Sequence, residues 1–269
     1  MGSGALEFGR TIKANRPFAQ LHPPAPYLFE DFLVDALADT PYVSVAQSGT
    51  PTAAAAISAT AGDPVAGHGG WLAGATDDVD AEIDEVAVGG LAATASAWRA
   101  DRVGAGGILV CEWGLTIPTA LTARQYFAGL TDDPTEGTGT NGSLNIATGT
   151  TITDVATDAA GFIFSSLATN PTIWKVGATD SGTQDTAVDT NLTAVFDTWT
   201  GLRVEVDVNG DAFFFIRRLR GGSLDFQGKS ANGLSPDVLL VPIFTAAPTT
   251  TTAVPWEVDY AFVSASHAV

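Results

Sequence analysis

Potential chemistry in this 269-residue chain is concentrated in one acidic segment, Asp77–Glu85. Carboxylates at this spacing could bind calcium, or could act as a general acid and a general base. Asp80, Glu82 and Asp84 alternate with apolar residues, so they would share one face of a β-strand. That arrangement is typical of a strand whose outer face is solvated. We therefore expect a solvated face, and the alternative is a weak calcium site formed by Asp77, Asp78 and Asp80.

The other residues that could do chemistry are scattered. The three histidines have no partner at metal-ligand spacing, and none belongs to a recognisable nucleophile motif. Asp207–Asp211 resembles the start of a calcium-binding loop, but Ala212 stands where the sixth position needs glycine. Cys111 is the single cysteine and lies in an apolar run, which favours a buried, unreactive thiol. We expect no catalytic residue, no metal and no cofactor, and interpret the protein as a non-enzyme.

Charge is distributed unevenly along the chain. The net charge of −18 argues against direct binding to nucleic acid phosphates. Residues 1–28 hold three basic residues and one acidic residue, a net of +2, which leaves nine basic and 29 acidic residues, a net of −20, for the remainder. Because no run of eighteen apolar residues occurs, we also expect no membrane association.

The elements that must position these residues are β-strands. The clearest is a hairpin over Gly201–Arg218, in which apolar and charged residues alternate on both sides of Asn209-Gly210, a pair that favours a type I′ turn. Roughly a dozen short β-forming runs follow one another between Gly, Pro, Asp and Asn residues, as in a sandwich. The sequence predicts an all-β, antiparallel β-sandwich over residues 28–269. Residues 1–27 show neither strand nor helix periodicity and predict an extended N-terminal arm, which is either a disordered terminus or a strap that becomes ordered against a partner.

The succession of strands resembles the concanavalin A-like jelly rolls of tailed-phage virion proteins, especially capsid decoration (cement) proteins. The resemblance covers about residues 28–265 and is carried by Phe29–Leu33, Gly107–Trp113, Gln125–Asp132, Asp158–Phe164, Leu202–Phe215 and Trp256–Ser264. It implies a structural protein that is made in the host cytoplasm and binds the outer capsid surface of the virion. Its partners would be the major capsid protein and further copies of itself, as a dimer or trimer.

Two basic clusters are candidates for these contacts. The arm is opposite in charge to the rest of the chain and could contact the capsid through Arg10, Lys13, Arg16 and Phe18. A second cluster ends the predicted hairpin. Arginine is enriched where protein surfaces meet, so we expect contact between copies at Arg217, Arg218 and Arg220.

Two alternative functions stay open. A lectin-like fibre or tail component would bind host glycans through Trp71 or through acidic loop residues. A polysaccharide hydrolase of the laminarinase kind would present Glu-x-Asp-x-x-Glu on one strand. Glu82 and Asp84 fit that pattern, but Ala87 occupies its last position, so the resemblance assigns no hydrolase residues.

Overall fold

The computed structural model describes residues 27–30, 43–47, 58–60, 71–76, 83–88, 98–103, 106–117, 122–133, 144–154, 156–195, 197–250 and 252–266. The predicted arm contacts Arg10, Lys13, Arg16 and Phe18 lie outside these residues. So do Asp77, Asp78, Asp80 and Glu82.

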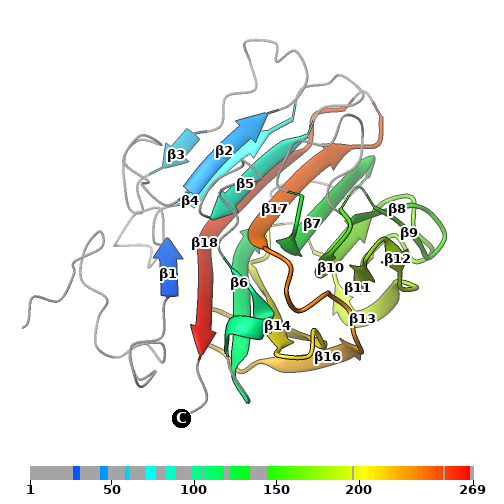
Figure 1. The fold of residues 1–269 in the computed structure, drawn as a ribbon. Coiled ribbons are helices and arrows are strands. Elements are labelled where there is room, and N and C mark those ends of the chain that lie inside the picture. Colours follow the sequence, from blue (N-terminus) through cyan, green and yellow to red (C-terminus); the bar gives the residue numbers. More distant parts are fainter. Residues whose placement is uncertain are drawn as a thin grey trace, which may run out of the picture.

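The described residues form two eight-stranded antiparallel sheets (Figure 1). The first, here called sheet A, has the order β16 (Asp225–Ser230), β15 (Ala212–Arg217), β14 (Thr200–Asp207), β6 (Ile108–Thr116), β18 (Pro255–Ser266), β4 (Trp71–Ala75) and β3 (Ser58–Thr60), with β1 (Tyr27–Glu30) also paired to β18. The second, sheet B, has the order β12 (Thr183–Gln184), β11 (Ile173–Asp180), β10 (Ala159–Ser165), β7 (Arg124–Thr131), β17 (Val241–Pro248), β5 (Asp84–Val88) and β2 (Val43–Gln47), with β13 (Val188–Thr193) paired to β11.

The main core lies between the two sheets. Strand residues alternate between its interior and the opposite face, as the pleat of a strand requires. Trp113, Trp174 and Trp256 are each at most 2% exposed and supply much of its volume. One end of the core is closed by the short helix η4 (Ala100–Val103), whose Ala100 and Val103 are buried. The prediction of an all-β sandwich is confirmed.

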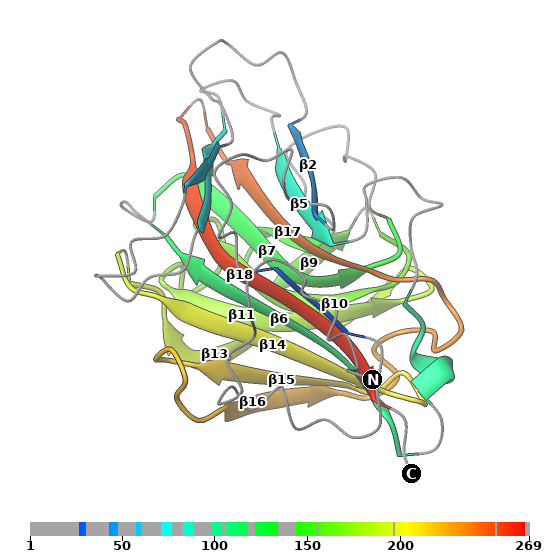
Figure 2. The same ribbon diagram turned by 90° about the vertical axis from the view of Figure 1, so that its left-hand side faces the viewer.

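A third layer covers part of the outer face of sheet B. Strands β8 (Leu144–Thr148) and β9 (Thr151–Asp154) form a hairpin. Its buried Leu144, Ile146 and Ile152 pack in a second apolar cluster with Phe127 and Ile163, which point outward from sheet B. Sheet A is seen from its own outer side in Figure 2, where β18, β6, β14, β15 and β16 lie side by side.

The predicted hairpin is confirmed as β14 and β15, but its turn differs from the prediction. Gly210 has a φ of 84°, whereas Asn209 is not in the left-handed region, so the turn is not type I′. The amide of Gly210 donates to the carbonyl of Asp207 at 3.0 Å. Asp207 Oδ1 accepts the amides of Asn209 and Asp211. An aspartate at this position favours a three-residue loop ending in a left-handed glycine. Asp207 therefore shapes the turn.

The predicted solvated face at Asp84 is wrong. Residues 83–88 are all buried, because β5 lies between β2 and β17 and is covered on both faces. Asp84 has the same parity as Val86 and Val88, which belong to the main core, and it is 0% exposed. Its Oδ2 accepts a hydrogen bond of 2.6 Å from the indole nitrogen of Trp256. Asp84 thus satisfies a buried donor within the core.

Candidate functional site

A buried carboxylate organises the outer face of sheet A. Glu112 on β6 is 0% exposed and points away from the main core. Its Oε1 accepts hydrogen bonds from Tyr260 Oη at 2.5 Å and from Arg217 Nε at 3.1 Å. Arg203 Nη1 lies 3.5 Å from its Oε2. Arg203 also pairs with Glu205 at 2.5 Å. We call these five residues, Glu112, Arg203, Glu205, Arg217 and Tyr260, the Glu112 cluster. Its two carboxylates and two guanidinium groups balance in charge.

Trp199 lies beside this cluster and is held by two charged groups. Its indole nitrogen donates to Asp259 Oδ2 at 3.0 Å, and Asp259 Oδ1 pairs with Arg220 Nη2 at 3.0 Å. The Arg220 guanidinium lies 5.9 Å from the centre of the Trp199 ring, within cation–π range. Two glycines make room for these side chains: a Cβ on Gly114 would come within 2.6 Å of the Tyr260 ring, and one on Gly201 within 3.0 Å of Trp199.

The electrostatics of this face favour fixed geometry. Burial and the adjacent Glu112 carboxylate both raise the pKa of Tyr260, so its hydroxyl stays protonated and remains a hydrogen-bond donor. Each carboxylate named above is paired with an arginine. Such a surface is well suited to rigid binding, because the side chains lose little further freedom when a partner covers them.

The three arginines predicted to contact another copy occupy different environments. Arg217 is 8% exposed and is used inside the chain, since its Nη1 also donates to the carbonyl of Gly222 at 2.6 Å. Arg218 is half-exposed and binds Asp225 and Asn191. Arg220 is partly exposed beside Trp199. Contact between copies stays a prediction, in which Arg218 and Arg220 are the members with accessible side chains.

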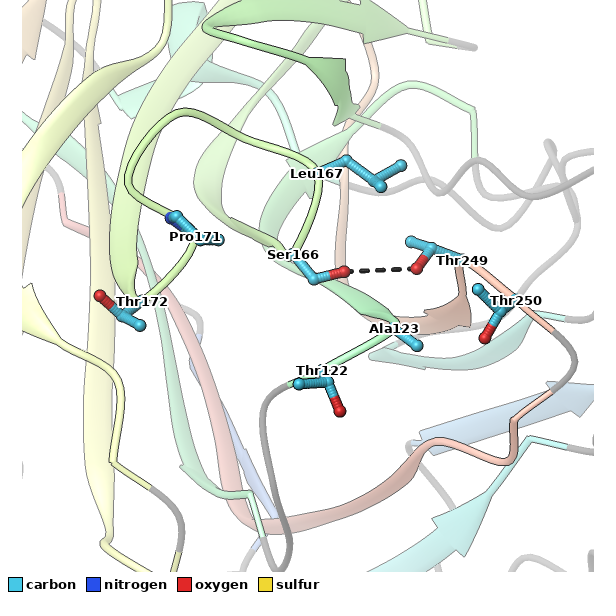
Figure 3. Close-up of a pocket in the computed structure, with 8 residues that line it drawn as sticks. All are labelled: Thr122, Ala123, Ser166, Leu167, Pro171, Thr172, Thr249 and Thr250. Atoms are coloured by element: carbon cyan, nitrogen blue, oxygen red, sulfur yellow. Dashed lines mark hydrogen bonds between the residues drawn. The ribbon is translucent and has the colours of Figure 1, made fainter.

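A separate hollow of about 380 Å³ lies where adjacent strands of sheet B end (Figure 3). Five of its eight lining residues carry a hydroxyl group, and none has an ionisable side chain: Thr122, Ala123, Ser166, Leu167, Pro171, Thr172, Thr249 and Thr250. Ser166 and Thr249 point toward one another, with 3.3 Å between their hydroxyl oxygens. Five of these residues carry a hydroxyl, but the surface that they present to the hollow is mostly apolar, so the hollow suits an uncharged ligand that offers an apolar face.

Of the two carboxylates named for a hydrolase, the structure describes one. Asp84 lies in the main core, and its proposed catalytic companion Glu82 is outside the described part of the chain. Within that part, no group of three or more His, Cys, Asp or Glu residues is arranged to hold a metal ion. The described residues also include no helix that is long and apolar enough to cross a membrane.

Cys111 is buried as predicted, and burial raises the pKa of its thiol.

Comparisons with known proteins identify the fold. No protein-family model matches the sequence, and no curated protein matches it significantly. Among solved structures, a Shewanella oneidensis protein of unknown function is 12% identical, with a TM-score of 0.54 over 89% of this chain and 85% of the other. Peanut lectin is 8% identical, with a TM-score of 0.53 over 92% and 100%. A Bacillus licheniformis β-glucanase is 9% identical, with a TM-score of 0.51 over 91% and 100%.

These similarities define the class: the protein is a concanavalin A-like jelly roll, the fold of the lectin and the glucanase. At such low identity the likeness extends to the fold and not to a ligand or a reaction. The fold predicted from the sequence resemblance is confirmed, whereas the virion role is a separate proposal.

Sequence reasoning missed the Glu112 cluster and the hydroxyl-lined hollow. A signal for the first was present, because Glu112 interrupts the apolar run of β6 and faces away from Cys111 and Trp113. Its partners could not be chosen without the strand register, which sets Glu112 opposite Arg203. The hollow is formed by three segments of ordinary composition that lie far apart in the sequence, so no motif marks it.

Proposed function

We propose that this protein is a non-enzymatic decoration protein that binds the outer surface of a phage capsid and stabilises the head. The observation that carries the proposal is the part of the outer face of sheet A around Trp199, where the partly exposed Arg220 is paired with Asp259 and lies against the Trp199 ring, beside Tyr260. Aromatic residues and arginine are enriched in protein interfaces. The opposite charges of residues 1–28 and the remainder also support it.

The mechanism is stabilisation by mass action. A module that binds the assembled shell, and not its separated subunits, stabilises the shell according to its occupancy. If the copies associate, several arms act together and raise avidity. Within the arm we assign capsid contact to Arg10, Lys13, Arg16 and Phe18, through attraction of the basic groups and burial of the ring.

The test is a binding assay with capsids that lack the protein. Deleting residues 1–26 should abolish co-sedimentation with capsids, and replacing the arm residues Arg10, Lys13 and Arg16 with alanine should weaken it strongly. Arg102→Ala is the matched control, because this side chain is 72% exposed and lies outside the arm. Undiminished binding by the deletion variant would exclude the arm as the contact.

Carbohydrate binding is the second candidate, and the hollow of Figure 3 is the observation that favours it. Its mostly apolar lining can cover the apolar side of a neutral sugar ring, and the hydroxyls of Ser166 and Thr249 can exchange hydrogen bonds with that sugar. This site differs from the predicted Trp71 or acidic loops. On a glycan array, Thr250→Tyr should fill the hollow and abolish binding, whereas Val188→Tyr on an exposed strand should not. Binding that survives Thr250→Tyr would exclude the hollow.

A further inference from the structure

Three phenylalanines form a patch on the outer face of β14, β15 and β16. The aromatic patch comprises Phe213, Phe215 and Phe226 together with the charged residues Arg203, Glu205 and Lys229, which border it. The rings of Phe215 and Phe226 meet edge to face, with 5.5 Å between centroids. Lys229 Nζ lies 5.1 Å from the centre of the Phe213 ring. Phe226 is 57% exposed, so much of its ring remains available to a partner.

The patch is ordered by interactions within the chain. Arg203 opposes Phe215 across the strand pair and is fixed by Glu205 and Glu112. Lys229 is paired with Asp211. A phenylalanine ring has no polar group that must stay hydrated, so covering it gains the hydrophobic free energy of its area. Little side-chain entropy remains to be lost from the fixed charged border.

The charge of the patch indicates its partner. Arg203 and Lys229 are balanced by Glu205 and Asp211, so the patch and its pairing residues are neutral within a chain of net charge −18. Two copies repel one another over most of an acidic surface, and they can approach most closely where the charge is balanced. A surface that carries both signs around an apolar centre can be complementary to itself about a two-fold axis.

We propose that the aromatic patch binds the aromatic patch of a second copy, forming a two-fold dimer. The second copy would add a layer over sheet A, as the β8–β9 hairpin does over sheet B. The proposal concerns the isolated protein and does not depend on capsid binding.

Sedimentation velocity of the full chain over a range of concentrations is the first test. We expect a reversible dimer whose dissociation constant rises at least about 30-fold in Phe226→Asp, as for a central interface residue. Val188→Asp is the matched control, because Val188 is 55% exposed on β13, outside the patch. A wild-type protein that stays monomeric overturns the proposal, as does a dimer that Phe226→Asp leaves intact.

Disulfide trapping provides an independent test. Cys111 is 0% exposed, so Phe226→Cys introduces an accessible thiol beside the predicted axis. We expect rapid oxidation to a covalent dimer, whereas Val188→Cys should remain monomeric under the same conditions. Equal cross-linking in the two variants would contradict the assigned surface. If the protein is monomeric and Phe226→Asp instead loses capsid binding, the patch faces the capsid and the dimer proposal fails.

Discussion

Replacing Glu112 with glutamine tests the role of the buried cluster directly. The change keeps the shape and one acceptor oxygen but removes the charge that faces Arg217, a side chain only 10% exposed. Removing one partner of a buried ion pair costs about 3–5 kcal/mol. In the variant, Arg217 still donates a hydrogen bond to the carbonyl of Gly222, and Arg203 still pairs with Glu205. We therefore expect a loss of unfolding free energy at the lower end of that range, about 3 kcal/mol.

The assay is urea unfolding followed by tryptophan fluorescence, with thermal unfolding in parallel. A loss of 3 kcal/mol corresponds to a fall in Tm of roughly 6–12 °C for a domain of this size. Asp225→Asn is the control: its side chain is 46% exposed and pairs with Arg218, which is 45% exposed, so we expect about 1 kcal/mol or less. In the double variant Glu112→Gln with Arg217→Met, part of the loss should be recovered, because no uncompensated guanidinium remains.

The reasoning is refuted if Glu112→Gln costs less than about 1 kcal/mol, or if it costs no more than Asp225→Asn. Either result would mean that Arg217 is stabilised without a negative charge. Absence of recovery in the double variant would show that the loss comes from altered packing and not from the unpaired charge.

Three further predictions follow from single contacts. Partial burial raises the pKa of Asp189, but hydrogen bonds from Lys175 and from the side-chain amide of Asn170 outweigh it, so the folded pKa lies below the ordinary value. The contribution of this carboxylate to stability is therefore complete above its unfolded pKa of about 3.9 and is lost as the pH falls through the lower folded pKa. In acid titration, Asp189→Asn should lose stability less steeply below pH 4 than the wild type, and identical profiles would contradict this. In urea unfolding, Gly210→Ala should lower the stability of the protein by more than Gly221→Ala. Both glycines have a positive φ, but only at Gly210 would an added Cβ clash with a backbone oxygen, that of Leu234 at 1.9 Å. Equal losses of stability would contradict the predicted clash. Cys111 should resist a thiol reagent in the native state and react once unfolded; fast native labelling would show that its strand opens.

The hairpin shows why the fold could be predicted. Alternation places Leu202, Val204 and Val206 on one face, and the structure buries all three in the main core. The turn was predicted incorrectly because the pair Asn209-Gly210 also fits a three-residue loop. The side chain of Asp207 binds two turn amides and favours that form, which a pattern of residue types does not reveal.

Asp84 shows the limit of the same reasoning. Alternating carboxylates predict a solvated face only when one side of the strand meets water. Strand β5 is buried on both sides, and Asp84 serves the indole of Trp256, which is 172 residues away in the sequence. A polar strand residue can be buried when a hydrogen-bond donor from a distant part of the chain lies beside it, as Trp256 does here. The local sequence around Asp84 does not identify that donor.

The two broad faces of the sandwich are completed in different ways. On sheet B the chain provides its own third layer, and the outward-facing Phe127 and Ile163 are buried in the apolar cluster to which the β8–β9 hairpin contributes. On sheet A the outward-facing Phe226 remains exposed, while the charged residues around it are already paired. Desolvating paired charges costs less than desolvating free ones, so a partner can cover this face at modest electrostatic cost. Sheet A is therefore the face on which we expect a second protein layer to be added.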